Sequence, residues 1–142
     1  MNLKISLVNA WNALDKKDAK RLTQALGELN QSSAANRFPI LASLLRGCIY
    51  IKFNDGVSAL LKAGAKPCVA DLSLAITERH ADIVRQLLAP ELLEKLARQL
   101  SSDSFAFAFQ QILPSRRNDY KKAYSQISAD CRTRLALWMS GR

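Results

Sequence analysis

The chain is 142 residues long, is 49% hydrophobic and carries a net charge of +9 at pH 7. This length and composition suit one folded unit with its own core, so we expect a single domain over residues 1–142 and exclude a wholly disordered chain. The charge favours acidic partners. The 21 lysines and arginines are nevertheless spread along the sequence, whereas nucleic-acid binders more often concentrate them on one element.

No segment has the pattern of a secretion signal or the roughly 20 apolar residues that cross a bilayer, so we expect no membrane association. Cys48, Cys68 and Cys131 are odd in number and widely spaced, which favours a reducing compartment over a disulfide framework. None of them stands close to another cysteine or to His80, as structural zinc ligands usually do, so we expect no metal and no cofactor. The predicted location is the cytoplasm, and translocation into another cell as an effector stays open.

Residues 4–67 predict two helix pairs. The first pair contains the apolar stretch Leu7–Ala10 and a second amphipathic segment over Arg21–Leu26. The second pair begins near Phe38-Pro39-Ile40 and includes Gly47-Cys48. Its last helix ends at Gly64, a residue that can take the left-handed conformation common just after a helix.

A third helix pair is predicted over residues 71–88. Leu72 and the apolar run Leu74–Ile76 precede Arg79-His80, and a second apolar face follows. This spacing predicts two short amphipathic helices with a tight turn at Glu78 to His80.

The segments Leu60–Pro67 and Leu72–Leu88 together resemble the ankyrin repeat, a helix–turn–helix unit of about 33 residues. The resemblance implies an all-α fold in which about three helix pairs stack over residues 4–89, and it places His80 in the turn, bonded to backbone groups. Ile40 precedes Leu72 by one repeat length, which puts Cys48 at the position of His80 one repeat earlier. The residues expected inside the stack are Leu7, Ala10, Leu22, Leu26, Ile40, Leu44, Val57, Leu61, Leu72, Ala75, Val84 and Leu88.

Residues 90–142 lie outside the resemblance and predict a helical cap over the last repeat. Pro90 can open a helix, Ser101 to Asp103 can cap a second one, and Pro114 ends it. Two more helices are expected, one with Tyr120 to Ile127 and one from about Ala129. The alternation of Phe105, Phe107 and Phe109 leaves a short strand as an alternative to the second helix.

The ankyrin resemblance implies a protein-binding module of adaptor or effector type, whose partner presents an acidic surface. Carried over residue by residue, it assigns contacts to the concave face formed by the first helix of each pair and to the loop tips. These contact residues are Ala42, Leu45, Arg46, Leu74, Thr77 and Glu78 on the face, with Lys66 and Cys68 on the loop.

Two other classes of function can be compared with the sequence. Nucleic-acid binding is the alternative, because Arg116, Arg117, Lys121 and Lys122 form a local basic cluster whose tyrosines could stack on bases. The same tyrosines could equally face the core. An enzyme is not expected, since the chain has one histidine, no acidic pair at a catalytic spacing and no glycine-rich phosphate loop.

The segment Ile49–Asp55 exceeds the repeat consensus by about five residues. It is apolar, which is unusual for a tolerated surface insertion. Two interpretations stay open: the segment contacts a partner, or it lengthens the preceding helix and buries Ile49 and Phe53 against the C-terminal cap. Replacing Tyr50 and Phe53 with Ser separates them, because only a buried ring is needed for stability.

Overall fold

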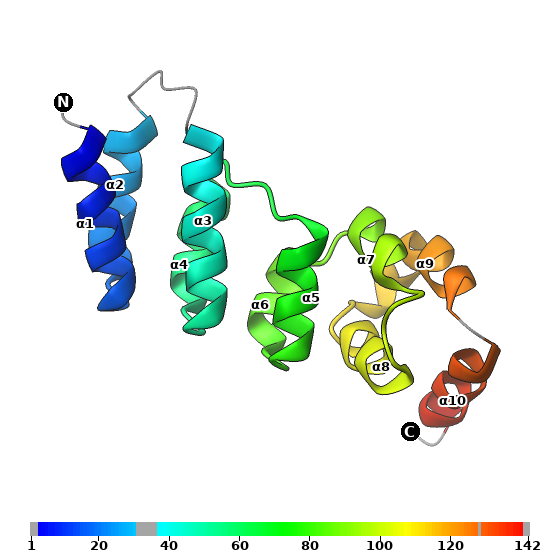
Figure 1. Ribbon diagram of the computed structural model, residues 1–142. Helices are drawn as coiled ribbons and strands as arrows, with labels where there is room; N and C mark the ends of the chain where they lie inside the picture. Colours follow the sequence, from blue (N-terminus) through cyan, green and yellow to red (C-terminus); the bar gives the residue numbers. More distant parts are fainter. Residues whose placement is uncertain (1–2, 31–36, 128, 141–142) are drawn as a thin grey trace. The chain divides into compact units, whose positions relative to one another are not determined.

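The computed structural model of the chain describes residues 3–30, 37–127 and 129–140. Within these ranges every regular element is a helix and none is a strand, which confirms the all-α fold class (Figure 1). None of the helices in the described part is both long enough and apolar enough to cross a membrane. In chain order the elements are α1 (Leu3–Asp15), α2 (Ala19–Asn30), α3 (Arg37–Tyr50), α4 (Asn54–Lys62), α5 (Val69–Thr77), α6 (Ala81–Leu87), α7 (Pro90–Leu96), α8 (Ser102–Gln110), the 3-10 helix η1 (Pro114–Tyr120), α9 (Lys121–Gln126) and α10 (Ala129–Ser140).

The chain divides into two compact units, residues 1–67 and residues 68–142. The division falls between the second and the third helix pair. The sequence instead predicted an internal boundary at Pro90, where the resemblance to the ankyrin repeat ends and the helical cap begins. Each unit is described below by itself.

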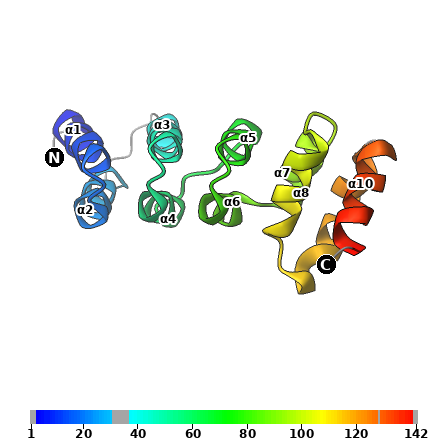
Figure 2. The ribbon, with the colours of Figure 1, turned by 90° about the horizontal axis from the view of Figure 1, so that it is seen from below.

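The first unit consists of the pairs α1/α2 and α3/α4. Helix α1 packs against α3 and α2 packs against α4, so the two pairs lie side by side in two layers (Figure 2). Asn30 Nδ2 donates to the Ala63 carbonyl oxygen at 3.3 Å, which ties the end of α2 to the end of α4. Gly64 follows α4 with φ = 106°, in the left-handed conformation that the sequence predicted for it.

Within each of the three helix pairs, the two helices are joined by the same kind of turn. After the first helix of each pair, one basic residue takes a positive φ: Lys17 (52°), Lys52 (59°) and Arg79 (54°). The next residue donates its backbone N–H to a carbonyl oxygen five residues earlier: Asp18 to Ala13 (2.8 Å), Phe53 to Cys48 (2.9 Å) and His80 to Ala75 (3.2 Å). This arrangement is the Schellman motif, which satisfies carbonyl groups that a helix end leaves unpaired.

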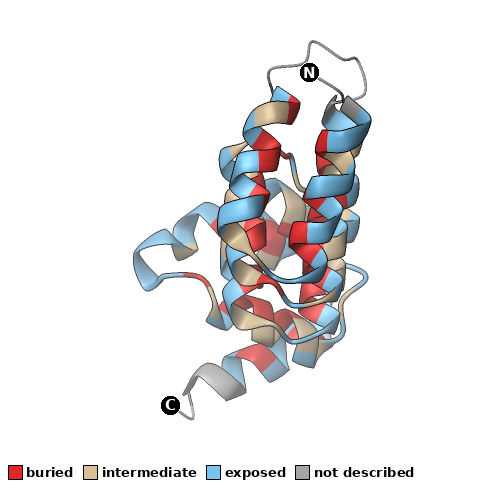
Figure 3. Ribbon diagram, turned by 90° about the vertical axis from the view of Figure 1, so that its left-hand side faces the viewer, coloured by how far each residue is buried: buried red, intermediate tan, exposed pale blue. Residues whose placement is uncertain are grey.

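Eight of the twelve residues expected in the core are buried and four are half-buried. In the first pair, α1 and α2, the buried residues lie on the sides where the two helices face one another, and the exposed residues lie on the outer sides (Figure 3). The half-buried residues are Leu7, Ile40, Leu61 and Leu88.

The register predicted for the second pair is wrong. Cys48 does not lie in the turn; it is fully buried in α3, and by the geometry of the turns it corresponds to Ala75, while Phe53 corresponds to His80. The segment Ile49–Asp55 is therefore no separate insertion. It forms the end of α3, the turn and the start of α4.

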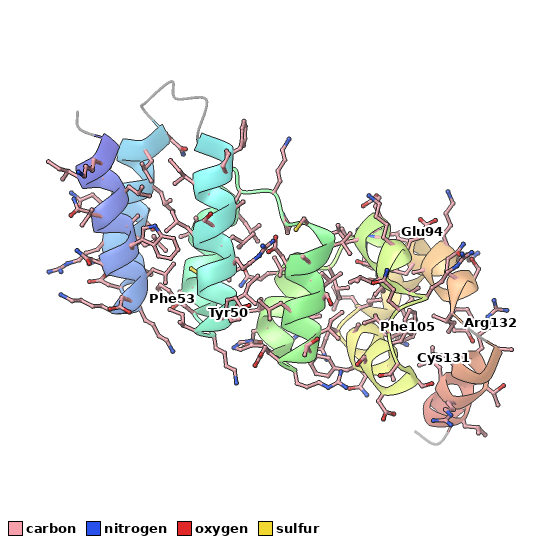
Figure 4. The ribbon with its side chains drawn as sticks, viewed as in Figure 1. Tyr50, Phe53, Glu94, Phe105, Cys131 and Arg132 are labelled. Carbon is pink, nitrogen blue, oxygen red and sulfur yellow. The ribbon has the colours of Figure 1, made fainter. Side chains whose placement is uncertain are left out.

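The second unit begins with the third pair, α5/α6. Helix α5 also contacts α7 and α8, while α7 contacts η1 and α9, and α8 contacts α10. The four predicted C-terminal helices are present as α7, α8, α9 and α10, and η1 is an element that the sequence did not predict. Phe105 is fully buried in helix α8, so the strand alternative for this segment is wrong (Figure 4). Its ring stacks on that of Phe109, with 6.2 Å between the centroids.

Candidate functional site

Two of the contact residues predicted on α3 lie at the surface and one does not. Arg46 is exposed and Ala42 is half-buried. Leu45 has 0% exposure and belongs to the core, so its assignment to a binding surface is wrong. In the structure it points between the helices because it lies about a third of a helical turn away from Arg46.

The remaining predicted contacts lie along the loop 63–68 and on α5. Lys66 is exposed, and its Nζ lies over the ring of Phe38 at 5.8 Å from the centroid. Cys68, Thr77 and Glu78 are exposed. Leu74, on α5, is half-buried. Lys66 belongs to the first unit, whereas the other four belong to the second.

A groove between α1 and α3 brings Ala42 and Arg46 together with residues that the sequence did not connect to them. The groove has a volume of about 350 Å³. Its lining residues are Trp11, Ala42, Ser43, Arg46, Gly47 and Tyr50. Trp11 was not singled out from the sequence, and its only signal was an aromatic residue on a helix predicted to be apolar.

Gly47 lets the two helices approach at this groove. A Cβ atom at position 47 would lie 3.0 Å from Cζ3 and 3.4 Å from Cη2 of Trp11. The indole therefore rests on the backbone of α3, and it remains 40% exposed on its other side. The sequence offered Gly47 as a turn residue, whereas the structure uses it for close packing.

Tyr50 and Phe53 occupy different environments, although only three residues separate them (Figure 4). Tyr50 ends α3 and is 64% exposed at the rim of the groove. Phe53 is 5% exposed, and its ring lies against Gly56. Ile49 and Phe53 are therefore buried, as the second interpretation of Ile49–Asp55 expected, and Phe53 lies against Gly56 of α4, whereas Tyr50 is exposed.

Three of the residues in the basic cluster already have neighbours in the second unit. Arg116 Nε donates to Asp119 Oδ2 at 2.8 Å. The guanidinium of Arg117 lies over the Phe109 ring at 4.9 Å from the centroid. Tyr120 is 7% exposed, and burial raises the pKa of its phenol above the ordinary value, with Arg116 acting in the opposite direction.

These contacts leave little for a nucleic acid in the cluster. Tyr120 cannot stack on a base while it is buried, so for this residue the core interpretation holds. Lys121 and Lys122 are exposed, but two lysines make a weak track for a phosphate backbone.

His80 has the structural role that was expected of it. Its Nδ1 accepts the backbone N–H of Ile83 at 3.3 Å, so the imidazole caps the N-terminus of α6. Asp71, 2% exposed, accepts the backbone N–H of Cys68 at 2.9 Å and fixes the start of α5 in the same unit. Both side chains position the backbone of the third pair.

Comparisons of the chain with protein-family models, with curated proteins and with solved structures find no match.

Proposed function

We propose that the chain is a protein-binding module of the ankyrin-like type, an adaptor or effector that holds an acidic protein partner on the outward side of its first helices. The observation that carries the proposal is the groove on α1 and α3, where aromatic side chains and an arginine share an exposed face. Trp, Tyr and Arg are the residues most enriched among those that dominate binding energy at protein interfaces.

The repeated turn supports the ankyrin-like part of the proposal. Three successive helix pairs use one Schellman turn with a basic residue at positive φ, and His80 caps the second helix of the third pair. The spacing is irregular, because Lys17, Lys52 and Arg79 are 35 and 27 residues apart, against about 33 in a regular array. Three free cysteines suit a reducing compartment, and we propose the cytoplasm, of the producing cell or of a recipient cell.

The test begins with the full chain as bait in an extract of its own cells, treated with nuclease, followed by mass spectrometry. The affinity of the purified partner is then measured for the double variant Arg46→Glu/Lys66→Glu. We expect at least tenfold weaker binding, because both positions are exposed on the first unit and would repel an acidic surface.

The matched control is Lys20→Glu/Arg98→Glu, which changes the net charge equally at exposed positions outside the groove. Binding within about twofold of wild type is expected for this control. Equal losses in both double variants would mean that only net charge matters and would reject the proposed surface. Capture that disappears with nuclease and depends on Arg116, Arg117, Lys121 and Lys122 would support the nucleic-acid alternative.

A further inference from the structure

A second groove of the first unit, which we call the polar groove, runs between α1 and α2 and has a volume of about 300 Å³. Its lining residues are Asn9, Asn12, Ala13, Lys16, Arg21, Gln24, Ala25 and Glu28. We infer that the polar groove binds a short extended peptide segment that carries a basic side chain and, a few residues away, an acidic one. This inference goes beyond the proposed function, because the two grooves share no lining residue.

The charged residues of the polar groove lie at its two opposite ends. Helices α1 and α2 run antiparallel, so the end of α1 lies beside the start of α2 (Figure 1). Lys16 directly follows α1 and Arg21 lies in the first turn of α2, so both are at the end of the groove near the connecting turn. Ser6 Oγ donates to Glu28 Oε2 at 3.1 Å, which places Glu28 beside the first half of α1. The groove is therefore positive at one end and negative at the other.

The two charges that we assign to the ligand are not balanced within the described part of the chain. Arg21 pairs with Asp18 at 3.4 Å, so the cation that meets the ligand is Lys16. Lys16 is exposed and forms no ion pair with the other described residues. The Glu28 carboxylate receives only the neutral hydroxyl of Ser6, which leaves its charge without a cation among the same residues. A segment with one charge of each sign would balance both.

Carboxamides and small side chains occupy the length between the charged ends. The side-chain amides of Asn9, Asn12 and Gln24 are exposed and bond to no other described residue. Each carboxamide can donate and accept hydrogen bonds at once, as a peptide group also does. Ala13 and Ala25 are buried and line the groove with methyl groups, which leave room for a main chain to come close. The middle of the groove therefore suits a peptide backbone.

The length of the groove sets the spacing of the two charges in the segment. Lys16 lies seven residues after Asn9, and Glu28 lies seven residues after Arg21. Seven residues of helix cover roughly 10 Å, at about 1.5 Å per residue. An extended chain covers the same distance in about three residues, at roughly 3.3 Å each. The segment should therefore carry its acidic side chain about three residues from its basic one.

Other classes of ligand fit the polar groove less well. A free phosphate or a nucleic-acid backbone would be repelled by the uncompensated charge of Glu28. A base would find no aromatic ring among the lining residues to stack on. A divalent cation would find a single carboxylate, and the described residues contain no cluster of metal-ligating side chains. A peptide with both charges matches the two ends and the middle together.

The test titrates the full chain, labelled with nitrogen-15, with three tetrapeptides whose ends are blocked. One peptide has lysine first and glutamate last around two alanines. The other two have lysine at both positions or glutamate at both. The mixed peptide should shift the side-chain amide signals of Asn9, Asn12 and Gln24 in NMR spectra. We expect it to bind at least about fivefold more tightly than either like-charged peptide, a preference that net charge alone does not produce.

Charge reversal in the groove should change this preference in a defined way. Lys16→Glu should transfer it to the peptide with two lysines. Lys16→Glu/Glu28→Lys keeps the net charge and exchanges the two ends, so it should bind the mixed peptide within about threefold of wild type. The matched control is Lys20→Glu, at an exposed position of α2 outside the groove, which should leave the preference unchanged. Melting curves check that each variant is folded.

Asn12→Ala/Gln24→Ala tests the contact with the peptide backbone. Alanine favours a helix, so the fold should be kept, while the mixed peptide should bind at least about fivefold more weakly because the carboxamide bonds are lost. Unchanged affinity of this variant would contradict the inference. It is also overturned if the mixed peptide shifts none of the amide signals, if the three peptides bind alike, or if Lys16→Glu behaves like Lys20→Glu.

A shift of the same amide signals by inorganic phosphate or an oligothymidylate, with none from the mixed peptide, would likewise overturn the inference in favour of an anion site. None of these variants changes Arg46 or Lys66. The result for the polar groove is therefore independent of the test of the proposed function.

Discussion

The three cysteine thiols have different surroundings, which makes them probes of the fold. Cys48 is fully buried, Cys131 is 4% exposed and Cys68 is exposed. Burial raises the pKa of the Cys48 thiol from 9.0 to about 12. Since the thiolate is the reactive form, Cys48 is protected both by its low access and by its protonation.

We therefore expect one thiol equivalent, that of Cys68, to react rapidly with an aromatic disulfide reagent at pH 8. The other two should react only after urea unfolds the chain. The assay is the absorbance of the released thiolate, with Cys68→Ser as the control that removes the fast phase. Two or three fast equivalents in the native protein would contradict the burial of Cys48 or Cys131.

The raised pKa of Cys48 also predicts how stability changes in alkali. The unfolded thiol loses its proton near pH 9.0, whereas the folded one holds it to about pH 12. Its contribution is therefore complete below about pH 9 and is lost as the pH rises toward 12. The difference in unfolding free energy between wild type and Cys48→Ala, measured in urea, should shrink from pH 8 to pH 10.5. A difference in unfolding free energy that stays constant over this pH range would contradict the prediction. The titration of lysines and tyrosines is common to both proteins and therefore cancels in the difference.

Two glycines in helices predict opposite effects of the same substitution. Nothing lies within 4 Å of a Cβ added at Gly27, so Gly27→Ala should raise stability by about 0.5–1 kcal/mol through reduced backbone entropy of the unfolded chain. At Gly56 the added Cβ would lie 2.5 Å from Cδ2 of Phe53 and 2.8 Å from Sγ of Cys48. Gly56→Ala should therefore lower stability by about 1–3 kcal/mol. Urea titrations of the pair check the sign, and a stabilising Gly56→Ala would mean that Phe53 packs elsewhere.

At the scale of the helices, the repeated turn explains where sequence interpretation succeeded. Glu78 to His80 was predicted as a turn, and Gly64 as a helix stop, because the apolar spacing or a glycine marked each place. The turn at Lys52 was missed because a lysine at positive φ has no signal in the sequence. The turn was instead assigned to Gly47, five residues earlier, and this assignment shifted the predicted register of the second pair.

Only some of the residues that line the groove between α1 and α3 could be predicted from the sequence, for a similar reason. Ala42 and Arg46 follow from the outward positions of α3, since helical periodicity defines a face. Trp11 could be added only once α1 was known to pack against α3 at Gly47, which no local pattern specifies. Leu45 was misassigned because the shifted register moved the predicted face by a fraction of a turn.

The positive φ of the turn residues predicts that glycine stabilises all three turns, the third less than the other two. A side chain in this conformation costs roughly 1–2 kcal/mol, part of which is offset by the greater freedom of glycine in the unfolded chain. Lys17→Gly and Lys52→Gly should each raise stability by about 0.5–1 kcal/mol. Arg79→Gly should gain less, because the Arg79 guanidinium lies 5.2 Å from the centroid of the Phe107 ring and that contact would be lost.

Lys52→Val is the control for the turn, since a β-branched side chain tolerates positive φ poorly and should lower stability. The measurements are urea titrations monitored by circular dichroism. If Lys52→Gly and Lys52→Val change stability in the same direction, the conformation of this turn is not the cause.

At the scale of the whole molecule, the division after Pro67 bears on how the chain opens. Most contacts of α1 to α4 are made among themselves, and the same holds for α5 to α10. Local openings of a protein commonly follow such compact groups of elements. A destabilising substitution in the core of one unit should therefore increase local opening first in that unit.

Phe53→Ser is a destabilising substitution of this kind in the first unit. Loss of the buried ring should cost about 3–5 kcal/mol. Hydrogen exchange followed by mass spectrometry should then show faster exchange of the amides in α1 to α4, with those in α5 to α10 close to wild type. Tyr50→Ser, at an exposed ring three residues away, is the matched control and should leave both sets unchanged. Equal acceleration in both sets would show that the two units open together, as one cooperative array in which each helix pair depends on its neighbours.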